Sequence, residues 1–150
     1  MVGTVMTHLD EGHYALKHLS SATPDARIAE AVKQKTSNGK ITCAASHKIA
    51  TELKVTPSKV GLVSDLLEVK LCKCQLGLFG YGPQRRIVKP AETIMPALKQ
   101  AIETSLVDNR LPCLTAWEIA DRFGLKKMDI SSACEALKVK ISACQIGSFK

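Results

Sequence analysis

The first clear hydrophobic pattern lies between residues 25 and 35, where Ile28, Ala31 and Val32 recur at the i, i+3, i+4 spacing of a helix. This spacing places the three side chains on one face, which predicts a helix with a single buried stripe. Thr23 and Pro24 precede it. They make a favourable N-cap and first-turn pair. The Thr hydroxyl can accept a hydrogen bond from a free N–H group of the first turn, and Pro has no backbone N–H that would need a partner at the first helical position. We therefore expect the first helix to begin at Pro24.

The hydrophobic period changes several times between this helix and residue 80. Asn38 and Gly39 break the helix, and apolar runs with helical or strand-like spacing follow. In chain order, these runs predict a short strand at 41–43, helices at 44–54 and 57–68, and a strand at 69–79. Thr56 and Pro57 mark the start of the third helix. The expected fold class is mainly α with short β-strands, an α+β arrangement.

The same pattern occurs twice in the chain. Residues 41–80 align on residues 111–150 without a gap when the sequence is shifted by 70 positions. Ten of the 40 aligned pairs are identical, which indicates a tandem duplication of one small domain. The identical pairs are Cys43/Cys113, Ile49/Ile119, Ala50/Ala120, Leu67/Leu137, Val69/Val139, Lys70/Lys140, Cys74/Cys144, Gln75/Gln145, Gly77/Gly147 and Phe79/Phe149.

The duplication sets the expected domain boundaries. In chain order, these are an N-terminal tail or short helix at 1–22, a first unit at 23–80, a linker at 81–89 and a second unit at 90–150. In the second unit we expect helices at 117–123 and 128–137 and a strand at 139–149. Pro96 lies inside the apolar stripe of that unit's first helix. The helix therefore either begins near Thr93 or is kinked at the proline.

The element order of each unit resembles a winged helix-turn-helix domain, with helix, short strand, helix, tight turn, helix and strand. Residues 49–60, IATELKVTPSKV, resemble the helix-turn-helix core, in which Ile49 and Ala50 pack where two helices cross. Gly124 stands at the turn of the second unit, where a left-handed residue is favoured, and Lys54 stands there in the first. The resemblance implies two tandem winged helix-turn-helix-like units.

In domains of this type the helix after the turn enters the DNA major groove, and a strand hairpin, the wing, touches the DNA backbone. The resemblance therefore implies that the helices at 56–68 and 127–137 read DNA. Their polar and basic side chains, expected on the exposed faces, are the candidate contacts to bases and phosphates. These candidates are Thr56, Ser58, Lys59 and Ser64 in the first unit and Lys126, Lys127, Ser131 and Ser132 in the second. The function expected is sequence-specific binding to double-stranded DNA, as in a transcriptional regulator.

The charge of the chain favours an anionic partner. Lys and Arg number 21 against 14 Asp and Glu, and the resulting formal charge of +7 is spread evenly along the sequence. Arg85 and Arg86 lie in the linker between the two helices expected to read DNA, where they could contact phosphates or simply be solvated. Acidic residues on the reading helices, such as Asp65 and Asp129, favour an alternative function, a scaffold or adaptor that docks a protein partner.

The six cysteines allow a further alternative, a thiol- or metal-responsive sensor. Cys43, His47, Cys72 and Cys74 are four candidate zinc ligands in the first unit. Their spacing differs from the usual pair of cysteines two residues apart, and the second unit lacks counterparts of His47 and Cys72. Buried cysteine acting as a small apolar side chain explains the repeated positions more simply, so no metal or cofactor is predicted.

Other function classes have no positive support in the sequence. No nucleotide-binding, serine-hydrolase or metalloprotease motif is present, so no enzymatic activity is expected. No run approaches the ~18 consecutive apolar residues that a membrane span needs, and the first residues lack the pattern of a signal peptide. Six cysteines without an export signal indicate a reducing compartment, and we expect a cytoplasmic protein with no membrane partner.

Overall fold

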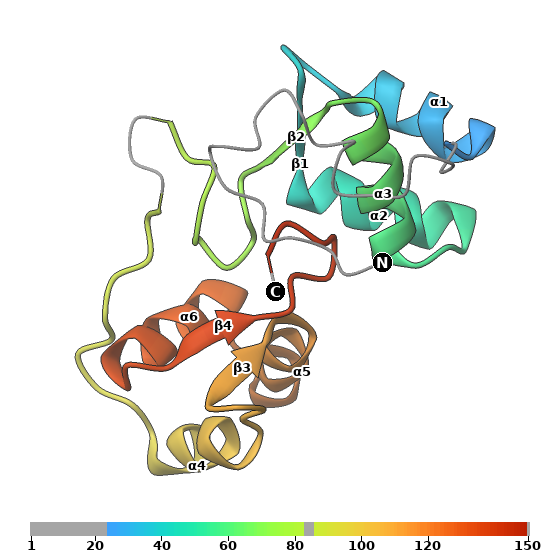
Figure 1. Cartoon of the computed structure of the whole chain (residues 1–150). Coiled ribbons are helices and arrows are strands. Elements are labelled where there is room, and N and C mark those ends of the chain that lie inside the picture. The colour runs from blue at the N-terminus through green and yellow to red at the C-terminus, as the bar shows by residue number, and fades with distance from the viewer. Residues whose placement is uncertain (1–23, 83–85, 150) are drawn as a thin grey trace. The chain divides into compact units, whose positions relative to one another are not determined.

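The computed structural model describes residues 24–82 and 86–149, which form a mainly helical protein with a few short strands (Figure 1). In chain order, the elements are α1 (Ala26–Lys35), β1 (Lys40–Thr42), α2 (Cys43–Leu53), α3 (Pro57–Leu66), β2 (Lys70–Cys72), α4 (Pro96–Thr104), β3 (Arg110–Pro112), α5 (Cys113–Phe123), α6 (Lys127–Ala136) and β4 (Lys140–Ser142). The α+β fold class is confirmed at this level. Within the described ranges, none of the helices has the length and apolar character needed to cross a bilayer.

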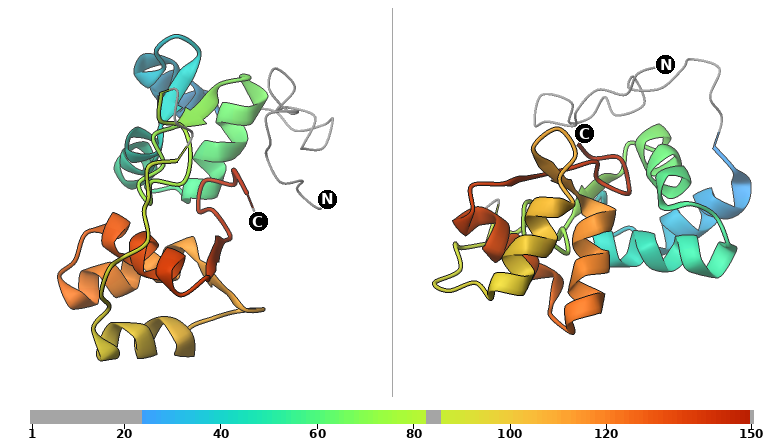
Figure 2. Two further views of the ribbon diagram at one scale, coloured as in Figure 1. Left: turned by 90° about the vertical axis from the view of Figure 1, so that its left-hand side faces the viewer. Right: turned by 90° about the horizontal axis from the view of Figure 1, so that it is seen from below.

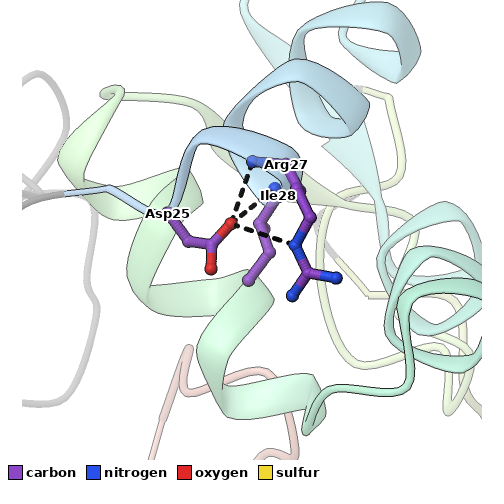
Figure 3. Close-up of polar contacts among 3 residues, drawn as sticks. All are labelled: Asp25, Arg27 and Ile28. Atoms are coloured by element: carbon purple, nitrogen blue, oxygen red, sulfur yellow. Dashed lines mark hydrogen bonds and ion pairs between the residues drawn. The ribbon is translucent and has the colours of Figure 1, made fainter.

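The start of α1 differs from the sequence prediction. The N-cap is Asp25, whose Oδ1 accepts hydrogen bonds from the backbone N–H of Arg27 at 2.9 Å and of Ile28 at 3.3 Å (Figure 3). Aspartate is a stronger N-cap than threonine and also meets the positive end of the helix dipole. The helix therefore begins at Ala26 and not at Pro24, and Thr23 lies outside the described residues.

The other helix starts follow local capping chemistry. Oγ1 of Thr42 caps α2 by accepting from the backbone N–H of Ala45 at 3.0 Å, and Thr56 caps α3 in front of Pro57, as predicted. In the second repeat, Pro96 is the first residue of α4 rather than a kink within it, because its missing N–H is not needed in the first turn.

Each repeat combines three helices with a two-stranded parallel sheet. In the first, α1, α2 and α3 pack on one another, while β1 lies beside β2 with Ile41 opposite Leu71 (Figures 1 and 2). In the second, α4 packs on α5 and α5 on α6, and Leu111 of β3 lies opposite Ile141 of β4. Buried aliphatic residues from the helices and the inner strands form the core of each repeat.

The strands are shorter than predicted. Strand-like residues extend over 69–79 and 139–149, but only three residues of each segment pair, because the partner strands β1 and β3 are themselves three residues long. Turns follow, and within the described residues no β-hairpin comes after β2 or β4. The prediction of long wing strands is therefore wrong.

The duplication is visible in the backbone as well as in the sequence. Six positions of the first repeat with positive φ recur 70 residues later, in pairs that need not share a residue type. The pairs are Asn38/Asp108, Gly39/Asn109, Lys54/Gly124, Glu68/Lys138, Lys73/Ala143 and Gly77/Gly147. Most residues avoid this region because of a clash of Cβ with the backbone, so the shared conformations reflect a shared fold.

The compact units do not coincide with the sequence repeats. Contacts group residues 24–74 with 145–149 as unit 1, whereas unit 2 consists of Gln75–Cys144. The last segment of the first repeat therefore belongs to unit 2, and the last segment of the second repeat belongs to unit 1. We call residues 145–149 the C-terminal strap and residues 75–79 the inner strap.

Both straps pack closely on a helix of the unit that receives them. The C-terminal strap crosses α3 at Gly61, where an added Cβ would lie 2.8 Å from the carbonyl carbon of Ile146 and overlap its carbonyl oxygen. The inner strap runs beside α6 of unit 2, where a Cβ on Gly77 would lie 3.4 Å from Sδ of Met128. Ile146 and Leu76, the equivalent aliphatic residues of the two straps, are both buried.

Candidate functional site

The connection between α2 and α3 is the part of unit 1 in which the sequence predicts a helix-turn-helix. Lys54 ends α2 in the left-handed conformation, and its backbone N–H donates to the carbonyl oxygens of Ala50 and Thr51. The turn brings Thr56 to the start of α3, where its Oγ1 accepts from the backbone N–H of Lys59 at 3.3 Å. A left-handed residue at the turn, expected at Lys54 and Gly124, is confirmed at both positions.

Three of the candidate DNA contacts gather at the start of α3. Thr56, Ser58 and Lys59 are all exposed, and the Thr56 and Ser58 hydroxyls share a hydrogen bond at 3.1 Å. The free N–H groups of a helix start carry partial positive charge, and the ammonium group of Lys59 adds a full one. The surface therefore combines positive potential with hydroxyl groups that can donate and accept.

The start of α6 has a different character. Lys126 is exposed, but Oδ2 of Asp129 accepts from its backbone N–H at 3.0 Å and places a carboxylate at the helix start. Lys127 is half-buried, with Nζ 4.4 Å from the centre of the Trp117 ring in a cation–π contact. The positive charge of this helix start is therefore partly offset by Asp129, and Lys127 is held against the protein.

The exposure predicted for the later turns of these helices is wrong. Ser64 is 3% exposed and Ser131 2% exposed, and neither hydroxyl has a hydrogen-bond partner in the described part of the chain. Ser132 is half-buried, and its carbonyl oxygen accepts from the backbone N–H of Ala91 at 2.9 Å. Gly61, one helical turn before Ser64 on the same face, lies under the C-terminal strap. Ser64 and Ser131 therefore cannot meet a DNA groove unless the residues that bury them move.

Of the two linker arginines, one lies outside the described residues and the other has a protein partner. Arg85 is the residue outside them. Nη2 of Arg86 lies 2.7 Å from Oε2 of Glu135, within unit 2, and both side chains remain well exposed. An exposed pair of this kind contributes only about 0–1 kcal/mol, so a phosphate could compete for Arg86.

The candidate zinc ligands do not come together as a site. Cys43 and Cys74 are buried, Cys72 is half-buried, and none of the six cysteines forms a disulfide. Within residues 24–82 and 86–149, no three His, Cys, Asp or Glu side chains are arranged to hold a metal ion. Cys43, His47, Cys72 and Cys74 therefore give the sensor alternative no geometric basis.

Cys134 on α6 is a titratable group that the sequence did not single out. Burial, with a smaller contribution from the charge of Glu135, raises the pKa of its thiol from 9.0 to about 12. Because the thiolate is the nucleophile, the thiol is protected both by its protonation and by its burial. Because it is buried on α6, Cys134 is a core side chain.

We expect Cys134 to resist alkylation in the folded protein at pH 8 and to react once the chain is unfolded. The pKa of this thiol is higher in the folded state than in the unfolded state, so the unfolded state releases the proton first. The contribution of the thiol to the free energy of unfolding is therefore lost as pH rises from 9 to about 12. Urea unfolding across this window should show a steeper loss for wild type than for Cys134→Ala. Equal pH slopes would contradict the prediction.

Comparisons of this chain with protein-family models, with curated proteins and with solved structures find no match.

Proposed function

We propose that this protein binds double-stranded DNA through the start of α3, acting as a DNA-binding regulator of the helix-turn-helix type. The observation that carries the proposal is the left-handed turn at Lys54, which leaves Thr56, Ser58 and Lys59 exposed at the beginning of the second helix. In helix-turn-helix proteins the first residues of the recognition helix contact base edges. The net charge of +7 supports attraction to a polyanion.

The contact surface proposed is narrower than the sequence predicted. It keeps Thr56, Ser58 and Lys59, and adds Lys54, whose exposed side chain stands at the turn. It leaves out the buried Ser64 and Ser131. Because Asp129 places a carboxylate at the start of α6, we expect unit 2 to contribute less to DNA affinity, through Lys126 alone.

The experiment is fluorescence anisotropy with a random-sequence duplex, in a salt series from about 50 to 200 mM. Binding should weaken steeply with salt, and Lys59→Glu should reduce the slope of log K against log salt by ~1, since each neutralised phosphate contributes ~0.9. Lys99→Glu is the matched control, because it changes the net charge equally at an exposed site on α4. It should leave most of the slope intact.

A second candidate function, docking of a protein partner, is favoured by the burial of Ser64 and Ser131 on the helices expected to read DNA. A docking module needs no polar reading face and no salt-dependent affinity for a duplex. No binding to the duplex at 50 mM salt, or equal effects of Lys59→Glu and Lys99→Glu, would replace the DNA proposal with this one.

A further inference from the structure

The face of α3 around Gly61 is covered by the C-terminal strap, whose residues Gln145 and Ile146 form a turn. Gly61 brings the helix backbone so close to the strap that a single methyl group would collide with the Ile146 carbonyl. The Ile146 side chain is 4% exposed, and its Cγ2 would lie 3.0 Å from an added Cβ. The surface therefore accommodates the backbone of the strap together with one aliphatic side chain. Glycine is rare inside helices because of its entropic cost, and this close approach accounts for it here.

The segment that covers this surface is the end of the second repeat. Residues Gln75–Cys144 belong to unit 2, and the strap that follows belongs to unit 1. The inner strap makes the converse connection, from unit 1 at Cys74 to unit 2. One chain thus already exchanges equivalent segments, which begin Gln-Leu-Gly and Gln-Ile-Gly, between its two repeats.

The residue at which the C-terminal strap leaves unit 2 is held in an unfavourable conformation. Ala143, exposed and directly before Cys144, has φ of 53°, and Lys73 has φ of 50° at the equivalent position. Alanine pays the full steric penalty of the left-handed region and has no polar side chain to offset it locally. Such a conformation persists only where surrounding contacts enforce it. The contact that follows Ala143 along the chain is the packing of the strap on α3.

We propose that α3 of one chain also accepts the C-terminal strap of a second copy of this chain, forming a symmetric strap-exchanged dimer with Ala143 as the hinge. A second copy carries the same strap and offers the same surface at Gly61, so the exchanged dimer repeats every contact that the strap makes within one chain. Extending the hinge also releases the strain at two alanines. The cost is the entropy of association, which makes the dimer dependent on protein concentration.

The hinge provides variants that act in opposite directions. Ala143→Gly accepts positive φ without strain and should favour the closed monomer. Ala143→Val places a β-branched residue there and should favour the extended hinge of the dimer. With a left-handed penalty of ~1 kcal/mol or more, the dimer dissociation constant should rise about 5-fold or more per hinge in Ala143→Gly.

The test is size-exclusion chromatography with light scattering on the full chain, from about 10 μM to 1 mM, after warming that allows straps to open. We expect wild type to form dimer at the upper concentrations, less of it in Ala143→Gly and more in Ala143→Val. Adding Gly61→Ala, which blocks the acceptor, should abolish the dimer in each background. Circular dichroism checks that each variant is folded.

A wild-type chain that stays monomeric throughout the series would overturn the proposal. So would a dimer that survives Gly61→Ala, because it would use another surface. If Ala143→Val fails to fold, the response of the wild-type dimer to Ala143→Gly still decides, since an unchanged dissociation constant excludes Ala143 as the hinge.

Discussion

Leu111→Ala is expected to lower the free energy of unfolding by about 2–4 kcal/mol, as deletions of this size do in well-packed cores. Leu111 is 0% exposed and occupies the middle of β3, opposite Ile141. Truncation removes buried apolar contacts and leaves a cavity that the short parallel sheet cannot close. Urea unfolding followed by circular dichroism measures the loss as a lower midpoint.

Leu114→Ala is the matched control for this substitution. Leu114 is three residues later, on α5, and is 53% exposed. The same chemical change should therefore cost no more than about 0.5 kcal/mol. An equal loss of stability in both variants would contradict the assignment of Leu111 to the core.

Gly61→Ala should destabilise unit 1 by about 1–3 kcal/mol, although alanine is the better helix former. The added methyl group would overlap the Ile146 carbonyl, so either the C-terminal strap or α3 must shift. Backbone atoms on both sides leave no flexible side chain to give way. We expect a lower urea midpoint together with faster hydrogen exchange at residues 145–149.

The equivalent position of unit 2 supplies the control. Ser131 stands where Gly61 stands in the alignment, and its buried hydroxyl has no hydrogen-bond partner in the described residues. Ser131→Ala removes that hydroxyl without adding volume, so it should be neutral or stabilising. A loss of stability in Ser131→Ala as large as that in Gly61→Ala would show that the strap contact is not what sets Gly61 apart.

Local signals in the sequence were sufficient for most of the elements. Thr56 and Pro57 fixed the start of α3 because capping depends on adjacent residues, and Gly124 marked its turn because left-handed backbone favours glycine. The start of α1 was misplaced where two neighbouring caps compete. Asp25 is the N-cap, and a carboxylate is a strong acceptor at a helix start.

The candidate site was harder to predict because its decisive contacts are not local. Helical periodicity placed Ser64 and Ser131 on the outer face of their helices, whereas both are buried in the structure. Likewise, the strand-like residues over 69–79 did not reveal that the segment from Gln75 onward belongs to unit 2, where Gly77 lies against Met128 of α6. Two signals were present: glycine within α3, and the concentration of identities in Cys-Gln-x-Gly-x-Phe at the end of each repeat.

The C-terminal strap also orders events during synthesis of the protein. Ile146 follows all of unit 2 in the chain, yet it completes the packing of α3 in unit 1. At ~5–20 residues per second, the ribosome needs roughly 4–14 s to make the second repeat, and during that time the nascent first repeat carries α3 with Gly61 uncovered. The first repeat, though synthesised first, therefore receives the segment that covers its α3 only after all of unit 2 has been made.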